Sequence, residues 1–191
     1  NNNNLELINI KLAGQFKAHL LISFIAGFII SVPYILFEIW RFIKPGLYKN
    51  EKKGFRGFVV FTSFLFFFGV VFGYFLINPL TVNFLSKYNI SDQVENQIHF
   101  MSYISTVSII PLSTGLVFQL PVIVFFLSKA NIVTPVLLKK YRKHSIVVFL
   151  ILSGIITPPD VISQILVSLP LILLYEMSIS ISGKKKKKNQ P

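Results

Sequence analysis

Five apolar runs separated by short polar segments dominate the pattern of this chain. A helix needs about 20 apolar residues to cross the ~30 Å hydrocarbon core of a bilayer. The first three runs reach that length, and the last two are shorter. The pattern predicts an all-α integral membrane protein with a single transmembrane domain over residues 1–183 and a basic tail over 184–191. The five expected helices cover about residues 18–40, 57–85, 100–127, 145–156 and 161–181.

The last two runs are expected to form a tight helical hairpin. Pro158 and Pro159 stand between them and end the fourth helix, because proline offers no backbone donor and restricts the residue before it. Asp160 follows as a suitable N-cap for the fifth helix. Because the fourth run is short, this hairpin would need a locally thinned bilayer to cross it.

Composition supports a membrane protein and argues against a soluble one. The chain is 53% hydrophobic and 14% charged, whereas soluble domains carry nearer a quarter charged residues. The net charge of +12 could suggest nucleic-acid binding. The cations instead cluster between apolar runs, which is typical of membrane topology, so we expect no nucleic-acid partner. The absence of cysteine excludes disulfides and thiolate chemistry.

The basic segments predict one orientation. Residues 41–56, 129–144 and the tail are rich in lysine and arginine, whereas residues 86–99 and 157–160 are not. Basic loops stay in the cytoplasm, so the C-terminus is predicted to be cytoplasmic and residues 1–17 external. An external start without a signal peptide implies an upstream helix. We therefore expect the chain to be a fragment of a six-helix protein.

Catalytic chemistry has little support in the sequence. His19, His99 and His144 are far apart and have no partner at ligand spacing. Neither a phosphate-binding loop nor a nucleophile elbow is present. We expect no enzymatic activity, no metal and no cofactor.

Polar residues inside the apolar runs are the better candidates, because burying them in a membrane is costly. Gln119 has two interpretations. It is either an amide that bonds a neighbouring helix or a carbonyl freed by Pro121, or a polar patch on a wall that faces a partner or a substrate. Glu176 is expected to be a snorkelling interfacial charge, and Glu38 an i,i+3 partner of Arg41. Five prolines lie in or near the spans, and they either are tolerated or kink the helices: Pro33, Pro79, Pro111, Pro121 and Pro170.

Several motifs follow one another in a characteristic order. The first is Phe42-Ile-x-Pro45-x-Leu47-Tyr48-x-x-Glu51, in a basic segment that otherwise carries lysines. Later come Tyr74-Phe-x-x-x-Pro79-Leu, Phe118-Gln119-x-Pro121-Val, Thr157-Pro-Pro-Asp-Val-x-Ser-Gln164 and Pro170-x-x-x-Leu-Tyr-Glu176. In this order and spacing, over about residues 17–183, the chain closely resembles the TatC family, the multi-spanning component of the twin-arginine protein translocase.

The resemblance implies a cup-shaped bundle of six helices that binds the twin-arginine signal peptides of folded precursor proteins in a bacterial inner membrane. The implied signal-peptide site includes Glu51, with Phe42, Pro45, Leu47 and Tyr48 around it. The family carries a second glutamate before its first helix, and this chain lacks the matching segment. The family also often has a glutamate where this chain has Gln119.

The resemblance implies partners as well. They are single-span subunits of the TatA and TatB type, further copies of the chain, and membrane lipid. Gln119 and Pro121 are candidates for the contact with the single-span helix. Pro158, Pro159, Asp160 and Gln164 would shape the external hairpin.

The chemistry of Glu51 fits such a role. A carboxylate accepts the planar fork of a guanidinium bidentately, and lysine cannot copy that geometry. Pro45 and Gly46 are suited to set the turn that holds Glu51 forward among lysines. Two other classes stay open. A small-solute transporter or channel would be expected to show internal repeats, and a truncated, non-functional fragment would share every feature described above.

Overall fold

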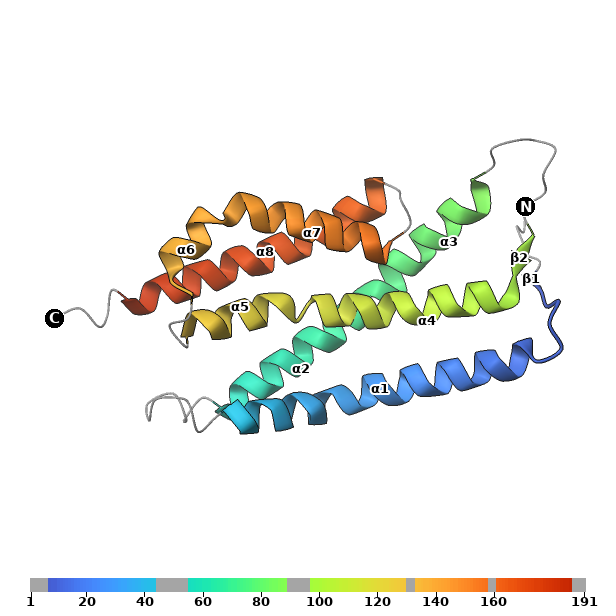
Figure 1. Cartoon of the computed structure of the whole chain (residues 1–191), viewed down its shortest axis with the longest axis horizontal. Coiled ribbons are helices and arrows are strands. Elements are labelled where there is room, and N and C mark those ends of the chain that lie inside the picture. The colour runs from blue at the N-terminus through green and yellow to red at the C-terminus, as the bar shows by residue number, and fades with distance from the viewer. Residues whose placement is uncertain (1–6, 44–54, 89–96, 130–132, 158–160, 187–191) are drawn as a thin grey trace.

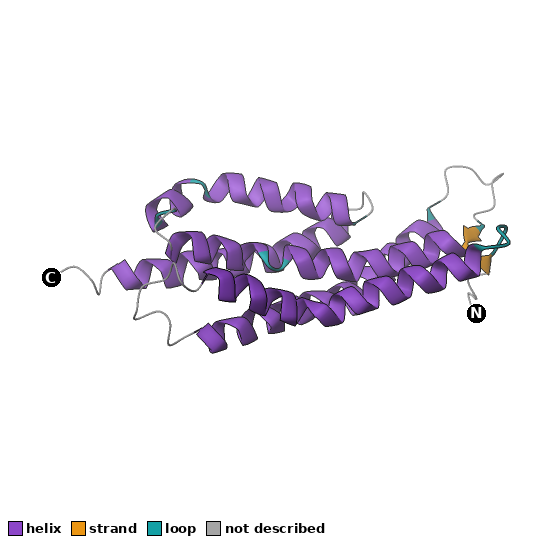
Figure 2. Cartoon of the chain, turned by 60° about the horizontal axis from the view of Figure 1, so that its bottom comes forward, coloured by secondary structure: helices purple, strands orange, loops and turns teal. Residues whose placement is uncertain are grey.

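The computed structural model describes residues 7–43, 55–88, 97–129, 133–157 and 161–186. They form a bundle of helices with one short strand pair (Figures 1 and 2). The all-α class predicted from the sequence is confirmed. The strand pair was not predicted: Leu7–Ile8 (β1) pairs in parallel with Ile98–His99 (β2).

The first half of the bundle contains two long helical rods. The first rod is α1 (Gly14–Ile43), whose 30 residues extend about 45 Å. The second rod has three consecutive parts: α2 (Phe55–Phe72), a π-helical turn η3 (Gly73–Ile77) and α3 (Asn78–Lys87).

The second half begins with a third rod and ends with a hairpin. The third rod consists of α4 (Phe100–Val117) and α5 (Leu120–Lys129). A short helix, α6 (Pro135–Lys140), leads into the hairpin of α7 (Arg142–Ile156) and α8 (Val161–Lys186).

Among the described residues, three stretches are long and apolar enough to cross a membrane: Gly14–Phe42, Gly57–Lys87 and Phe100–Val124. The apolar part of α8, Val161–Met177, is shorter. At 15 residues, α7 extends about 22 Å, less than a typical hydrocarbon core. Whether the hairpin crosses the bilayer therefore stays a prediction.

The three rods pack side by side, and the hairpin covers one end of the third. α2 crosses α4, α1 lies along α4, and α8 packs against both α5 and α7 (Figure 1). The core includes four side chains with 0% exposure, Phe66, Phe118, Val167 and Leu171. The ends of α1 and α8 lie at one end of the molecule, whereas the start of α1 and the strand pair lie at the other (Figure 1).

The prolines divide into two groups. Pro33, Pro111 and Pro170 lie inside α1, α4 and α8. Pro79 is the second residue of α3, after the π-helical turn, and Pro121 is the second residue of α5, after the break between α4 and α5. Proline cannot donate to the carbonyl one turn back, so a departure from α-helical bonding next to it is expected.

The segment between α5 and α7 differs from the prediction. Residues 129–144 were expected to form a basic loop, but Pro135–Lys140 form α6. Thr134 caps this helix, since its Oγ1 accepts from the backbone N–H of Leu137 at 3.3 Å. α8 also continues into the lysine tail, to Lys186.

Candidate functional site

The recognition motif lies on the segment that joins α1 to α2. Residues 44–54 are outside the described residues, so Glu51, Pro45, Leu47 and Tyr48 are not placed. Phe42, in the last turn of α1, is placed, and its side chain is 86% exposed. An exposed aromatic ring at a helix end is available for contact with another molecule or with lipid.

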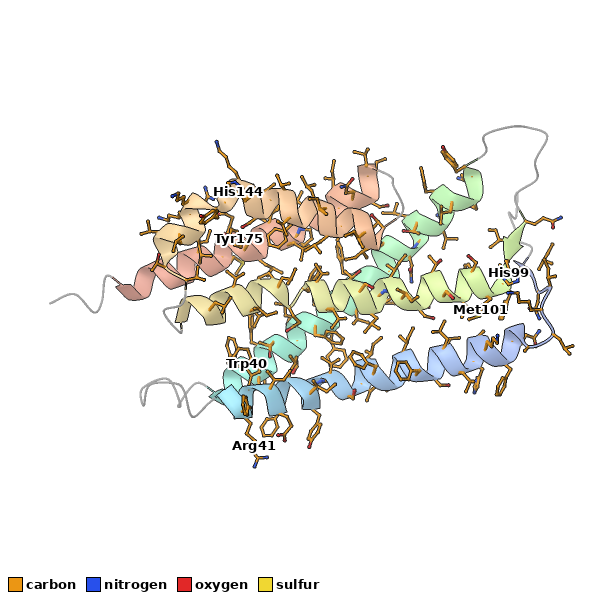
Figure 3. The ribbon with its side chains drawn as sticks, in the orientation of Figure 1. Trp40, Arg41, His99, Met101, His144 and Tyr175 are labelled. Atoms are coloured by element: carbon orange, nitrogen blue, oxygen red, sulfur yellow. The ribbon has the colours of Figure 1, made fainter. Side chains whose placement is uncertain are left out.

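The helix ends on either side of this segment are well packed. Trp40, at the end of α1, is buried, and its ring meets that of Phe58 at the start of α2 edge-on, with centroids 4.5 Å apart. Arg41 extends away from the bundle (Figure 3) and donates to Glu38 at 3.4 Å. The predicted i,i+3 pair is therefore confirmed. Because both arms of this ion pair are exposed, it contributes little to stability.

Gln119 lies at the break between α4 and α5. Its side chain is 8% exposed, and its Nε2 donates to the carbonyl oxygen of Thr62 in α2 at 3.1 Å. The interpretation as an amide that bonds a neighbouring helix is thus confirmed. Pro121, two residues on, is also buried. The amide joins the third rod to the second, at a point where membrane burial makes an unpaired amide costly.

Glycines let these two rods approach closely. A Cβ added to Gly69 would lie 2.9 Å from the Cα of Gly115, and one added to Gly115 would lie 2.7 Å from a methyl of Val70. Small residues at a helix crossing are typical of membrane bundles, because they bring the backbones together. Phe118 fills the space beside Gly69 and is fully buried.

Asn78 is a second buried amide, and the sequence pattern did not single it out. It begins α3, is 4% exposed, and donates through Nδ2 to the carbonyl oxygen of Val107 in α4 at 2.9 Å. The available signal was a polar amide inside the apolar run of residues 57–85. Asn78 and Gln119 thus link the same two rods at separate levels.

The hairpin motif is only partly described. Pro158, Pro159 and Asp160 lie outside the described residues. Gln164, in the first turns of α8, donates through Nε2 to the carbonyl oxygen of Leu150 in α7 at 2.9 Å. Its amide also packs over Gly154, where an added Cβ would be 3.2 Å from Nε2. Gln164 therefore clamps the two helices of the hairpin together.

The other end of the hairpin carries two further contacts. Tyr175 of α8 is buried and donates its hydroxyl to the carbonyl oxygen of Leu138 in α6 at 3.0 Å. Glu176 accepts from Arg142, the first residue of α7, in an ion pair. Glu176 was predicted to be a snorkelling charge. Its side chain is 31% exposed, so it reaches the surface, and it does so bound to an arginine.

Comparison with known proteins gives the family. Residues 2–170 match the family model for the Sec-independent protein translocase protein TatC. Proteins with that name from Blattabacterium sp. subsp. Periplaneta americana and Helicobacter pylori strain J99 are 43% and 45% identical to the chain. These matches cover 94% and 84% of the chain, and 67% and 64% of the relatives. The chain thus spans about two thirds of their length.

A solved structure agrees with the sequence relatives. The crystal structure of a twin-arginine translocase receptor, TatC, in the detergent DDM superposes with a TM-score of 0.78 at 36% identity. The superposition covers 93% of this chain and 79% of the solved one.

Proposed function

The chain belongs to the TatC family, and from this premise we propose that it is the multi-spanning receptor and scaffold subunit of a twin-arginine translocase. In this role it binds the signal peptides of folded precursor proteins and does not itself catalyse a reaction. The family membership carries the proposal. The packing of Trp40 in α1 against Phe58 in α2, on either side of the segment with Glu51 in the sequence, supports it.

The proposed orientation puts the recognition segment on the cytoplasmic face of a bacterial inner membrane. The end of α1, the start of α2, α6 and the end of α8 lie at the same end of the molecule (Figure 1). In the sequence, the segments rich in lysine and arginine adjoin these helix ends, which is the distribution that keeps loops in the cytoplasm.

Glu51 is the proposed contact for the arginines of the peptide. A guanidinium and a carboxylate form paired, charge-assisted hydrogen bonds, each worth roughly 1.5–3 kcal/mol when the groups are held in place. Phe42 is exposed at the edge of the same segment and would supply apolar contact to the peptide. Pro45, Leu47 and Tyr48 complete the proposed site.

The proposed partner contact is at the break between α4 and α5. Gln119 already bonds Thr62, so a single-span partner helix would reach that amide only by opening this bond. Leu116 and Ile123 flank the break and are about half exposed, at 47% and 50%. A partner helix is therefore proposed to pack first on these two residues and the wall that carries Pro121. A photo-crosslinker at either position that never captures a single-span subunit would count against this contact.

The test of Glu51 uses the full-length protein in lipid nanodiscs and a fluorescent signal peptide. Glu51→Gln keeps the size of the side chain and removes the charge. It is expected to weaken binding of a peptide with an Arg-Arg pair by about 10- to 100-fold, the ratio that corresponds to the loss of one charge-assisted bond.

Glu38→Gln is the matched control. It removes a carboxylate in the last turns of α1, the helix that precedes the segment with Glu51, and Glu38 is already paired with Arg41. Binding should change by less than about twofold, as expected for an exposed pair. A peptide with Lys-Lys in place of Arg-Arg should bind weakly to every variant. Equal losses in the two glutamine variants would show that only net charge matters and would refute the assignment of Glu51.

A further inference from the structure

A short segment at the start of the hairpin presents apolar and cationic side chains together. It comprises residues 134–144 and is called the α6 platform below. Its exposed apolar residues are Val136 at 71%, Leu137 at 40% and Tyr141 at 47%. Its exposed charged or titratable residues follow directly: Lys139, Lys140, Arg142, Lys143 and His144.

The α6 platform is fixed to the rest of the bundle. Leu138 is 6% exposed and belongs to the core, and its carbonyl oxygen accepts from the hydroxyl of Tyr175. Arg142 is held by Glu176. The ring of His144 lies edge-on to that of Tyr141, with centroids 5.5 Å apart. These contacts hold the backbone that carries the lysines in place.

The charges on the platform are unbalanced. Within the described residues, Lys139, Lys140 and Lys143 form no ion pair, and the nearby carboxylate of Glu176 is already bound to Arg142. Three cations therefore remain on one small surface. An anionic ligand would compensate them, whereas a cationic signal peptide would be repelled.

The position of the platform relative to the bilayer follows from α7. Its apolar face begins at Ile146, three residues after Lys143, which is about 4.5 Å along the helix. If α7 enters the membrane, the platform lies at the level of the lipid headgroups. Exposed Val136 and Leu137 beside lysines are the arrangement found in helices that lie in this interface.

We propose that the α6 platform binds the headgroups of anionic phospholipids. The three lysines contact the phosphate and the anionic headgroup, and the exposed apolar side chains enter the upper acyl region. The apolar component favours a lipid over a nucleic acid or an acidic peptide, which would gain nothing from contact with Val136. The site is separate from Glu51. It rests on the proposed insertion of α7 into the membrane, and on the proposed orientation for the choice of leaflet.

The test uses phosphatidylglycerol with a photoreactive group in the headgroup, and the full-length protein in nanodiscs of phosphatidylcholine. Labelled peptides are mapped by mass spectrometry. Labelling within residues 134–144 is expected in the wild type. Replacing the three lysines by glutamine should reduce it by about 100-fold, since each cation near a lipid surface is worth about fivefold in affinity. The substituted residues are Lys139, Lys140 and Lys143.

Two control variants distinguish binding at the α6 platform from a general effect of the net charge of the protein. The first replaces the same three lysines by arginine and should retain labelling, which also shows that the segment tolerates substitution. The second makes an equal change of charge at the opposite end of the molecule and should leave labelling unchanged. Its glutamine substitutions are at three exposed lysines, Lys11, Lys17 and Lys87.

Four results would overturn the proposal. They are equal loss of labelling in the distant variant, equal labelling by a phosphatidylcholine probe, no change in the variant with three glutamines, and displacement of the lipid probe by inorganic phosphate. The last would reveal a site for free anions. Persistence of labelling in the presence of phosphate and its loss with the glutamine substitutions would support a lipid site.

Discussion

The crossing of α2 and α4 predicts a strong effect of one added methyl group. In Gly69→Ala the new Cβ would lie 2.9 Å from the Cα of Gly115 and 2.9 Å from Cγ of Phe118. The first neighbour is backbone, and the second is a side chain with 0% exposure. Neither can move without separating the two helices, so the methyl group forces the rods apart.

The size of the effect can be worked out against a matched glycine. Gly27, in α1, has no atom within 4 Å of an added Cβ among the described residues. Gly27→Ala should therefore show only the helix preference of alanine, about 1 kcal/mol in favour of the folded state. Gly69→Ala gains the same term and suffers overpacking of about 1–3 kcal/mol. The free energy of unfolding should thus differ between the two variants by about 1–3 kcal/mol.

Trp40 provides the assay, because it is the single tryptophan of the chain and is buried against Phe58. Its fluorescence can follow unfolding in dodecyl maltoside micelles as the fraction of SDS is raised. Gly69→Ala should unfold at a lower SDS fraction than Gly27→Ala. If both variants are stabilised alike, the two rods do not approach as closely as described, and the reasoning from the crossing fails.

Two further predictions concern single hydrogen bonds. Gln119→Leu removes the bond to Thr62 and should lower the free energy of unfolding by about 0.6–1.7 kcal/mol, the range of such bonds inside membranes. The same fluorescence titration measures this change, and an unchanged midpoint would show that the bond contributes nothing. Tyr175→Phe removes the bond to the Leu138 carbonyl and should lower the free energy of unfolding by about 0.5–1.5 kcal/mol. It should also speed amide hydrogen exchange in α6. Exchange as slow as in the wild type would mean that other contacts hold α6.

Hydropathy and local spacing predicted the features that depend on one helix alone. The all-α class follows from apolar runs that are too long and too continuous for a soluble core of this size. The pair of Glu38 and Arg41 follows from i,i+3 spacing, because residues three apart share a helix face. In both cases the information lies within a short stretch of sequence.

The sequence could not predict which helices contact each other. Gln119 bonds Thr62 across 57 positions, and Asn78 bonds Val107 across 29. A polar residue in an apolar run indicates that some partner is needed, but not which helix supplies it. The sequence therefore leaves two interpretations of Gln119 open and does not single out Asn78.

The sequence also could not predict short helices such as α6. α6 has six residues and ends in two lysines, so neither its length nor its hydropathy distinguishes it from a basic loop. Its position is set by tertiary contacts, through burial of Leu138 and the hydroxyl of Tyr175. The prolines show the same limit, since Pro33 lies inside a helix whereas Pro121 follows a break. Packing around each proline decides between these outcomes.

The pairing of the carboxylates at the predicted cytoplasmic end affects which of them could bind the arginines of a ligand. The sequence puts three of its seven acidic residues at the predicted cytoplasmic end, and the structure pairs two of them, Glu38 and Glu176, with Arg41 and Arg142. An incoming guanidinium would have to displace an existing one at either position. Glu51 stands among lysines in the sequence, and a lysine offers a carboxylate a single point charge, which a bidentate guanidinium can replace. The distribution of arginine and lysine along the chain therefore favours Glu51 as the proposed contact for the arginines of a ligand.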